Sequence, residues 1–369
     1  MKFIYELQYN FVILRHQTHA SRMKDITPVN IKTFTRLIDE ARNPIIVTHA
    51  KPDGDAIGSS AAMFHFLGLC GKEDRLLVLN DSCPRFLGFI RDNIPQGSLI
   101  IREENNQKAL DAIEMADLII CLDFHAFYRT GALETPLAES KAKKILIDHH
   151  LDPDRSLYDL SFSKNDISSA SELLFWILMA TPQIDGKAEN LPPEGATALM
   201  TGMTTDTNNF GNSVYPSTLA MASDLLRAGV DRDMILQKLN QEHTESRLRL
   251  KGFMLKDLLK VTKDGVAYMV LDKKAQYGYK MQEGDTEGFV NEPLSIGKVR
   301  MSIFAREESG EVRISIRSKR GTSANRCAKL FFNGGGHENA AGGKLHIPIN
   351  EVAGYIERHT HIYMTEYEK

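Results

Sequence analysis

The residues that could do chemistry gather first in the segment HAKPDGDAIGS, residues 49–59. His49, Asp53 and Asp55 can all bind a metal ion, and they fall within seven residues. Gly54 separates the two aspartates and permits a sharp turn, so both carboxylates can point to one place. A solvated polar loop with an Asp-Gly turn is the alternative, but these are more potential ligands than a turn requires. We therefore interpret the segment as part of a metal site.

Three later segments supply aspartate or histidine directly after apolar stretches. Asp123 follows LIICL, the run Asp148-His149-His150 closes KILI, and Asp206 stands in a Thr-Asp-Thr segment after ATALMTGM. Asp123 taken singly could simply cap a following helix, and the Thr-Asp-Thr segment, which we expect to be a loop, could also be a capping device. Two adjacent histidines after an aspartate are less usual, and they favour a functional site.

Taken together, the four segments offer carboxylate and imidazole ligands but no thiolate. This ligand chemistry favours Mn²⁺ or Mg²⁺ over a structural zinc ion. Several aspartates close together would repel one another and raise each other's pKa unless cations neutralise them. Two divalent ions would do so, and metal pairs roughly 3.5–4 Å apart are common in phosphoryl displacement. The sequence therefore predicts a two-metal centre that acts on phosphate esters.

The elements that must position these residues alternate between apolar strands and helices. We expect strands at 44–50, 75–80, 116–124 and 143–150, and helices at 31–42, 59–69, 171–180 and 196–203. This alternation predicts an α/β fold with a mostly parallel sheet and helices on both faces. Ligands of such folds bind beyond the carboxyl ends of the strands, where the four segments stand. We place this catalytic domain at residues 23–215.

From Pro216 onward the hydrophobic pattern of the sequence changes, first to helical segments alone and then to strand-like alternation. Residues 216–262 have helical patterns without strands, and we interpret them as a helical connector. Strand-like alternation then appears, followed by a helical segment, a glycine cluster and a final strand, which predicts a smaller α/β domain at 263–369. The expected strands are 265–272, 299–307 and 311–318, and the expected helix is 324–332.

The bulk composition is that of an ordinary globular protein. The 369 residues carry a formal net charge of −3, which argues against a strongly basic nucleic-acid binder, and the four cysteines form no CxxC pair. No apolar run approaches the roughly 18 residues that a membrane span requires. Residues 1–22 do not resemble a secretory signal, and Met23 is a plausible alternative start. We expect a cytoplasmic location and no membrane partner.

The four segments resemble, in order and spacing, the motifs of the DHH phosphoesterase superfamily. THAKPDGDAIGS, the strand-end Asp123, the Asp-His-His run and the Thr-Asp-Thr segment carry this resemblance. It implies that two metal ions, Mn²⁺ or alternatively Mg²⁺, are held by six residues: one ion by His49 and Asp53, the other by Asp55, His149 and Asp206, with Asp123 bridging both. It also implies that Asp148 supports the site, that His150 faces the scissile phosphate or leaving group, and that a metal-bridging hydroxide attacks phosphorus.

The segment NGGGHENAAGG, residues 333–343, is the other strong signal. Gly334, Gly335 and Gly336 could close their backbone N–H groups around an anion, and His337 could donate to a phosphate oxygen, although a flexible glycine loop is the alternative. The segment resembles the GGGH motif of the small domain that accompanies nuclease-like DHH proteins. Among the basic residues between 300 and 330, most of which we expect on a solvated face, Arg317 in RISIRS matches the arginine that meets substrate phosphate in that family.

The resemblance is strongest to the nanoRNase (NrnA) type, because residues 285–294 also match that branch. It implies hydrolysis of short oligoribonucleotides, linear dinucleotides and 3′-phosphoadenosine 5′-phosphate, so the expected partner is short RNA or a small nucleotide. An exopolyphosphatase-like hydrolase and a catalytically silent nucleotide-binding protein are the alternatives, and a homodimer stays open. His125 departs from the family pattern; a metal contact, a substrate contact and a plain loop residue are its three interpretations.

Overall fold

A computed structural model describes residues 26–151, 153–240, 244–282 and 284–368. The chain divides into two compact units, Met1–Gln241 and Glu242–Lys369. The expectation placed on residues 1–22 lies outside the described residues. None of the described helices is long and apolar enough to cross a membrane.

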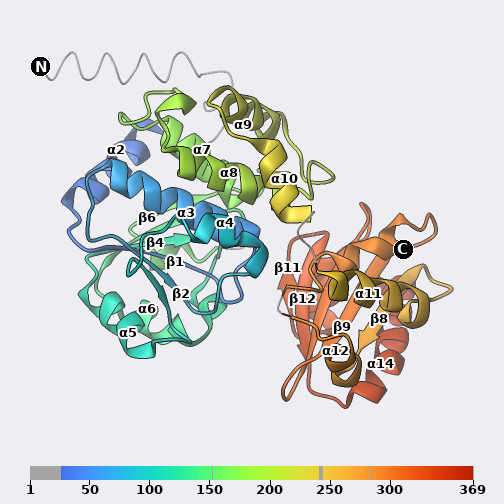
Figure 1. Cartoon of the computed structure of the whole chain (residues 1–369). Coiled ribbons are helices and arrows are strands. Elements are labelled where there is room, and N and C mark those ends of the chain that lie inside the picture. Colours follow the sequence, from blue (N-terminus) through green and yellow to red (C-terminus); the bar gives the residue numbers. More distant parts are fainter. Residues whose placement is uncertain (1–25, 152, 241–243, 283, 369) are drawn as a thin grey trace, which may run out of the picture. The chain divides into compact units, whose positions relative to one another are not determined.

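The first unit is built on a six-stranded sheet in which every pair of neighbouring strands is parallel (Figure 1). The strands run in the order β3-β2-β1-β4-β5-β6. Their bounds are β1 Pro44–Thr48, β2 Leu76–Leu79, β3 Leu99–Ile101, β4 Leu118–Leu122, β5 Lys143–Asp148 and β6 Leu160–Ser163. The strand order reverses between β1 and β4, and ligands of open parallel sheets bind beyond the carboxyl ends at that point.

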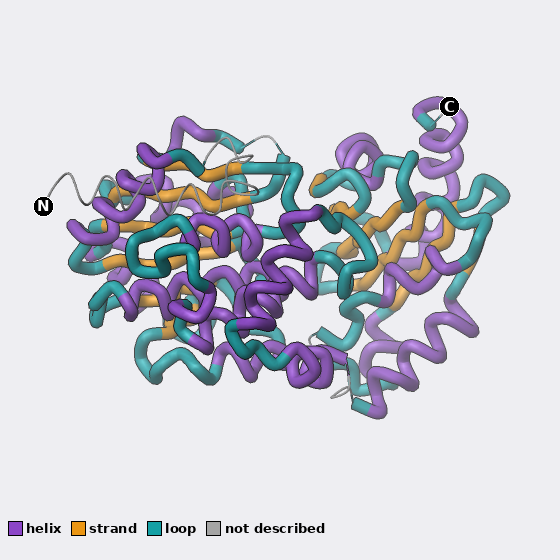
Figure 2. Tube along the Cα trace, turned by 90° about the horizontal axis from the view of Figure 1, so that it is seen from above, coloured by secondary structure: helices purple, strands orange, loops and turns teal. Residues whose placement is uncertain are grey.

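Helices cover both faces of this sheet (Figure 2). The helices of the unit are α2 Pro28–Glu40, α3 Gly54–Leu69, α4 Gly88–Arg91, α5 Asn106–Met115, α6 Glu134–Glu139, α7 Ala170–Met179, α8 Pro193–Asp206, α9 Pro216–Arg227 and α10 Arg232–Asn240, of which α9 and α10 pack on α8 and not on the sheet. Successive residues of a strand pack into two different hydrophobic clusters, one on each face of the sheet. Ile46 and Ile120 belong to one cluster, and Ile45 and Ile119 belong to the other. The expected α/β fold with a parallel sheet covered on both faces is confirmed.

Helices α3 and α8 cross at very short range because both carry glycine at the contact. A Cβ atom on Gly58 would lie 2.6 Å from the carbonyl oxygen of Ala198 and 2.9 Å from the Cα of Gly202. At the end of the contact, a Cβ atom on Gly54 would lie 2.3 Å from the side-chain oxygen of Thr205. No larger residue fits without moving backbone, so glycine sets the distance between the first turn of α3 and the last turn of α8.

The second unit has a mixed six-stranded sheet in the order β11-β12-β10-β9-β8-β7. Only β8 and β9 pair in parallel; the other pairs are antiparallel. The strands are β7 Lys260–Val261, β8 Val266–Leu271, β9 Met301–Glu307, β10 Val312–Ser318, β11 Gly335–Gly336 and β12 Ala340–Leu345. The helices are α11 Glu245–Phe253, α12 Lys273–Gly278, α13 Ala324–Phe331 and α14 Ile349–Ile362.

Some elements differ from the sequence expectation. The Thr-Asp-Thr segment is not the expected loop, because α8 continues through Asp206. Helix α14 and the short strand β6 were not expected from the sequence. Helices α9 and α10, which we assigned to a connector, contribute Met221 and Ile235 to the main hydrophobic cluster of the first unit.

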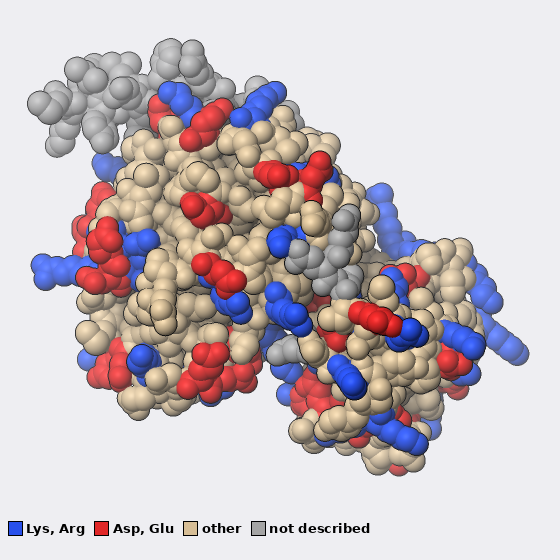
Figure 3. Space-filling view, viewed as in Figure 1, with Lys and Arg blue, Asp and Glu red and all other residues tan. Residues whose placement is uncertain are grey.

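The charged side chains of the visible face are of mixed sign. Figure 3 shows Lys and Arg interspersed with Asp and Glu over that face. This distribution agrees with the small formal net charge of −3. The face shown therefore offers no extended field of one sign to a long polyanion.

Candidate metal centre

The first two candidate ligands stand at the ends of the central strands. His49 follows β1 and Asp123 follows β4, and β1 and β4 are paired neighbours. His49 Nδ1 lies 2.9 Å from the carbonyl oxygen of Ala50, which leaves Nε2 directed at Asp123 Oδ2 at 3.5 Å and at Asp53 Oδ1 at 3.9 Å. Asp123 has a positive φ of 62°, an uncommon conformation for a residue with a side chain. Such strain concentrates at functional sites.

The carboxylates of Asp53 and Asp55 are each held by backbone N–H groups at a helix start. Asp53 caps α3, and its Oδ1 accepts from the backbone of Asp55 and Ala56 at 3.1 Å each. Asp55 is buried and accepts from the first turn of α7: Ala170 donates to Oδ2 at 2.6 Å and Ser171 to Oδ1 at 2.9 Å. Helix N-termini favour negative charge, and these N–H groups fix the positions of both carboxylates.

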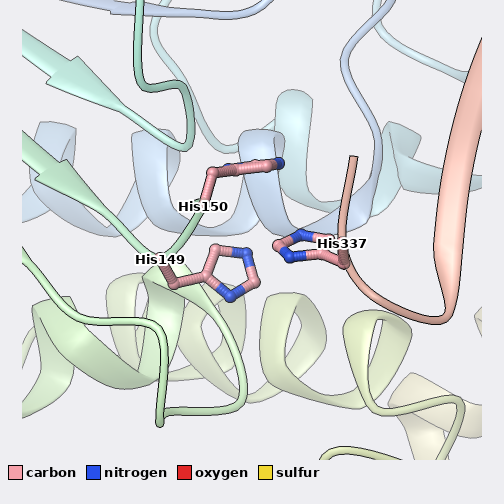
Figure 4. Close-up of side chains that lie close together, drawn as sticks. All are labelled: His149, His150 and His337. Atoms are coloured by element: carbon pink, nitrogen blue, oxygen red, sulfur yellow. The ribbon is translucent and has the colours of Figure 1, made fainter. Parts of the chain in front are cut away.

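His149 lies in the middle of three carboxylates. It follows β5 together with His150, as Figure 4 shows for the two side chains. His149 Nε2 lies 3.3 Å from Asp123 Oδ1, 3.4 Å from Asp206 Oδ2 and 3.7 Å from Asp55 Oδ2. The α3–α8 crossing brings Asp55 and Asp206 together here, because they stand in the first turn of α3 and the last turn of α8.

His150 is oriented by a different partner from that of His149. Its Nδ1 lies 2.8 Å from Asp148 Oδ1, and its backbone N–H donates to Asp148 Oδ2 at 3.2 Å. Both residues are buried. A carboxylate that accepts from Nδ1 fixes the tautomer and the ring plane, which makes Nε2 the nitrogen available for chemistry.

The structure thus brings together all six residues that the sequence nominated as metal ligands. Asp123 belongs to three groups of potential ligand atoms, and the atoms of each group lie within 4.8 Å of one another. The groups are His49, Asp53 and Asp123; Asp55, Asp123 and His149; and Asp123, Asp148 and His150. Asp206 joins the second group through His149. Asp123 Oδ1 is buried and makes no hydrogen bond within the described chain, although His149 Nε2 is only 3.3 Å away. A buried carboxylate oxygen whose neighbours are two imidazoles, at 3.3 and 3.6 Å, fits a site built for cations.

The ionisation of the cluster also points to missing positive charge. Burial and the nearby Asp123 raise the pKa of Asp55 to about 7. Burial raises the pKa of Asp206 well above its usual value, and Asp55, Asp53 and Asp123 add to that effect. Burial acts to lower the pKa of His149, but Asp206, Asp123 and Asp55 outweigh it and raise the pKa well above normal. In the ion-free protein, a proton on His149 therefore stands among the carboxylates where a cation would be.

Asp123 and His150 shift in the opposite direction. Burial acts to raise the pKa of Asp123, but the surrounding histidines outweigh it and hold the pKa well below its usual value. Burial lowers the pKa of His150 well below normal. The Asp123 carboxylate acts to raise this pKa, whereas the positive charges of His149, Arg129 and His49 lower it further. These shifts favour an ionised Asp123 and a neutral His150 at physiological pH.

The residues nominated in the second unit lie beside one another within that unit. Arg317 stands in β10 opposite Ala340 of β12, and the backbone N–H of His337 donates to the carbonyl oxygen of Ala340 at 2.7 Å. The N–H groups of Gly334 and Gly336 donate to Ala328 O and Asn325 Oδ1. A Cβ atom on Gly334 would lie 1.8 Å from Gly342 O, and one on Gly343 would lie 2.2 Å from Phe332 O. Close backbone approach therefore explains glycine at these positions.

Two residues near the centre were missed by the sequence reasoning. The backbone carbonyl of Arg129 accepts from Ala50 at 2.7 Å, which places it beside His49. Glu172 is fully buried and accepts from Ser168, Thr218 and Trp176. No spacing pattern marks either residue, because their partners come from distant segments. Since Glu172 ties down the start of α7, it supports the N–H groups that hold Asp55.

The fold and this cluster define a two-unit α/β protein whose carboxylate and histidine side chains converge at the edge of a parallel sheet. The family model described as "DHH family, N-terminal domain" matches residues 43–203, and the "DHHA1 domain" model matches residues 263–353. The chain belongs to the DHH family of phosphoesterases, which confirms the resemblance inferred from the motifs.

Several known proteins are similar over most of the chain. The bifunctional oligoribonuclease and PAP phosphatase NrnA of Thermus thermophilus is 29% identical over 85% of this chain and 88% of its own length. The Bacillus subtilis protein of the same name is 25% identical over 82% of this chain and 89% of its own length. A crystal structure of an exopolyphosphatase-related protein from Bacteroides fragilis is 36% identical, with a TM-score of 0.83, and the match covers 92% of this chain and 97% of that one.

Proposed function

We propose that this protein is a metal-dependent phosphoesterase that hydrolyses short oligoribonucleotides, linear dinucleotides and 3′-phosphoadenosine 5′-phosphate. The observation that carries the proposal is that the ligand groups of His49 and of His149 share the buried Asp123. The names of the Thermus and Bacillus relatives support this substrate class. A cytoplasmic location belongs to the same proposal.

Six residues would hold two divalent cations, with Mn²⁺ as the expected ion and Mg²⁺ as the alternative. His49 and Asp53 would hold one cation, Asp55, His149 and Asp206 the other, and Asp123 would contact both. The burial of Asp123 Oδ1 among imidazoles and the raised pKa values of Asp55 and His149 support this fit. Bound cations would supply Lewis acidity and a nucleophile at neutral pH.

The protein's own groups would orient the substrate, and the bare Nε2 of a neutral His150 would accept a hydrogen bond or a proton there. Asp148 holds Nδ1 of His150, so His150 would meet the scissile phosphate or the leaving oxygen through Nε2. In the second unit, Arg317 and His337 would bind substrate phosphate through their side chains. Because the N–H groups of Gly334, Gly336 and His337 already have acceptors, the glycine segment would contribute its close packing more than an N–H cradle.

An exopolyphosphatase-like activity is the second candidate. It is favoured by the similarity to the exopolyphosphatase-related protein of Bacteroides fragilis, which is 36% identical to this chain. Phosphate chains require the same cations and the same basic side chains, so the site alone does not separate the two substrates. A silent nucleotide-binding protein is disfavoured by the complete set of six ligand residues.

The test is turnover by the purified full chain with Mn²⁺ on a panel of substrates. The panel contains a dinucleotide, a 24-mer RNA, 3′-phosphoadenosine 5′-phosphate, a cyclic dinucleotide and polyphosphate. We expect fast cleavage of the dinucleotide and the bisphosphate, and loss of both activities in Asp123→Ala. Cleavage of polyphosphate alone would select the second candidate, and nucleotide binding without turnover of any substrate would select the silent protein.

A further inference from the structure

The short 3-10 helix η3, Phe127–Leu133, carries two side chains that the proposed mechanism does not use. It follows Asp123 by three residues, and its Tyr128 and Arg129 stand in the segment HAFYRT. Both residues belong to the first unit.

Helix η3 is fixed against the loop that carries His49. The N–H of Ala50 donates to the carbonyl oxygen of Arg129 at 2.7 Å, and the N–H of Ala132 donates to Asn80 Oδ1 at 3.2 Å. Gly131 has a φ of 64°, and a Cβ atom there would lie 2.9 Å from Asn80 Nδ2. The backbone of the segment is therefore held at Arg129 and at residues 131–132, next to the loop that carries His49.

Arg129 is a positively charged residue that forms no ion pair among the described residues. The residue is half-buried, and in the described parts of the chain no carboxylate pairs with its guanidinium. Its own backbone carbonyl is the group that accepts from Ala50, the residue after His49, so Arg129 is attached directly to the loop of the cluster. A half-buried guanidinium on a segment bonded to the His49 loop, with no carboxylate paired to it among the described residues, is suited to bind an anion from solution.

Tyr128 offers an aromatic ring to solvent at the side of His150. Its residue is 60% exposed, and its hydroxyl lies 2.9 Å from His125 Nε2. The His125 ring packs edge-on against Tyr128 at 5.6 Å and lies 5.7 Å from the His150 ring. His125 therefore lies between the exposed Tyr128 ring, which it contacts through the hydroxyl, and the His150 ring. Aromatic rings held in this way are platforms on which nucleobases stack.

We propose that Tyr128 and Arg129 form a nucleotide subsite on the first unit, in which Arg129 binds a substrate phosphate and Tyr128 stacks on a nucleobase. This subsite rests on the proposed function, because it presumes a nucleotide substrate. It explains why an arginine and an exposed ring occupy successive positions of a segment that is bonded to the His49 loop and lies near His150. It also gives His125 a role: the histidine orients the Tyr128 ring.

The two roles separate in a binding experiment that does not depend on turnover. AMP and ribose 5-phosphate share a phosphate and differ in the base, so calorimetry with both on the Mn²⁺-loaded full chain resolves the two contacts. Tyr128→Ala should weaken AMP about tenfold and leave ribose 5-phosphate unchanged, while Tyr128→Phe, which keeps the ring, should stay within a fewfold of the wild type. Arg129→Ala should weaken both ligands by about tenfold or more.

Arg42→Ala is the matched control for Arg129→Ala. Arg42 is exposed and precedes β1, at the opposite end of that strand from His49, so both ligands should bind as they do to the wild type. Equal weakening of AMP and ribose 5-phosphate by Tyr128→Ala, or no weakening of either, would overturn the stacking role. Unchanged affinities in Arg129→Ala would overturn the phosphate role, and a wild-type protein that binds no AMP would overturn the subsite. Failure of the proposed function would show separately, as absence of dinucleotide hydrolysis.

Discussion

Replacing Gly58 by alanine would force apart the two helices that carry Asp55 and Asp206. The added methyl carbon would lie 2.6 Å from Ala198 O and 2.9 Å from the Cα of Gly202, and both are backbone atoms of α8. Ordinary contacts of this kind begin near 3.4 Å, so relief requires a separation of about 0.8 Å.

That separation is large on the scale of a metal site. Ligand distances in such sites hold to about 0.2 Å, so the second ligand group would be distorted although no ligand is removed. Disturbing groups that support metal ligands typically costs about 10- to 100-fold in metal affinity or activity. The extra methyl group should also lower the free energy of unfolding by about 1–3 kcal/mol, as overpacking does elsewhere.

The assay is Mn²⁺ affinity by calorimetry together with chemical denaturation of the same samples. Gly195→Ala is the matched control, because Gly195 lies in α8 and faces α3 as well, but its added carbon would meet only His65 at 3.4 Å and Ala62 at 3.6 Å. That control should bind Mn²⁺ normally and keep or slightly gain stability. If Gly58→Ala binds Mn²⁺ as tightly as the control, the spacing of the two helices does not position the site.

Three further predictions concern the buried groups of the site. His149→Ala should weaken Mn²⁺ binding measured by calorimetry, whereas His150→Ala should bind Mn²⁺ normally and hydrolyse substrate slowly. The reverse pattern would show that His150, and not His149, is the metal ligand. Glu172→Gln should lower the free energy of unfolding by about 1–3 kcal/mol, since an amide leaves one donor unpaired. It should also weaken Mn²⁺ binding. An unchanged free energy of unfolding together with unchanged Mn²⁺ affinity would contradict the view that Glu172 supports the N–H groups that hold Asp55. Asp55 binds a proton up to about pH 7 in the folded metal-free protein but only to about 3.8 when unfolded. Its contribution to stability in EDTA should therefore fall as pH rises from about 4 to 7, and melting curves in which Asp55→Asn shows the same decline would refute this.

The ligand set could be predicted from the sequence because its signals are local. His49, Asp53 and Asp55 stand in one segment, and Asp123 and His149 directly follow apolar runs. Once those runs are taken as parallel strands, their carboxyl ends meet at one edge and the side chains must converge. Only the alternation of strands and helices was needed for this step.

The remaining features depend on contacts between distant segments and leave no local signal. Glu172 matters through Thr218, and Arg129 through Ala50. The glycines of residues 334–336 suggested an anion loop, but the backbone approach to residues 341–343 that explains them appears only when β11 pairs with β12. The end of α8 was misplaced for a similar reason, since tertiary packing on α3 extends that helix beyond its apolar pattern.

The most direct test of the account is anomalous diffraction at the manganese edge from crystals of the full chain grown with Mn²⁺. We predict two peaks on either side of the Asp123 carboxylate, one also contacted by His49 and Asp53 and the other by Asp55 and His149. No peak at Asp123, or ions bound only elsewhere, would contradict the central claim that this cluster is a two-metal centre.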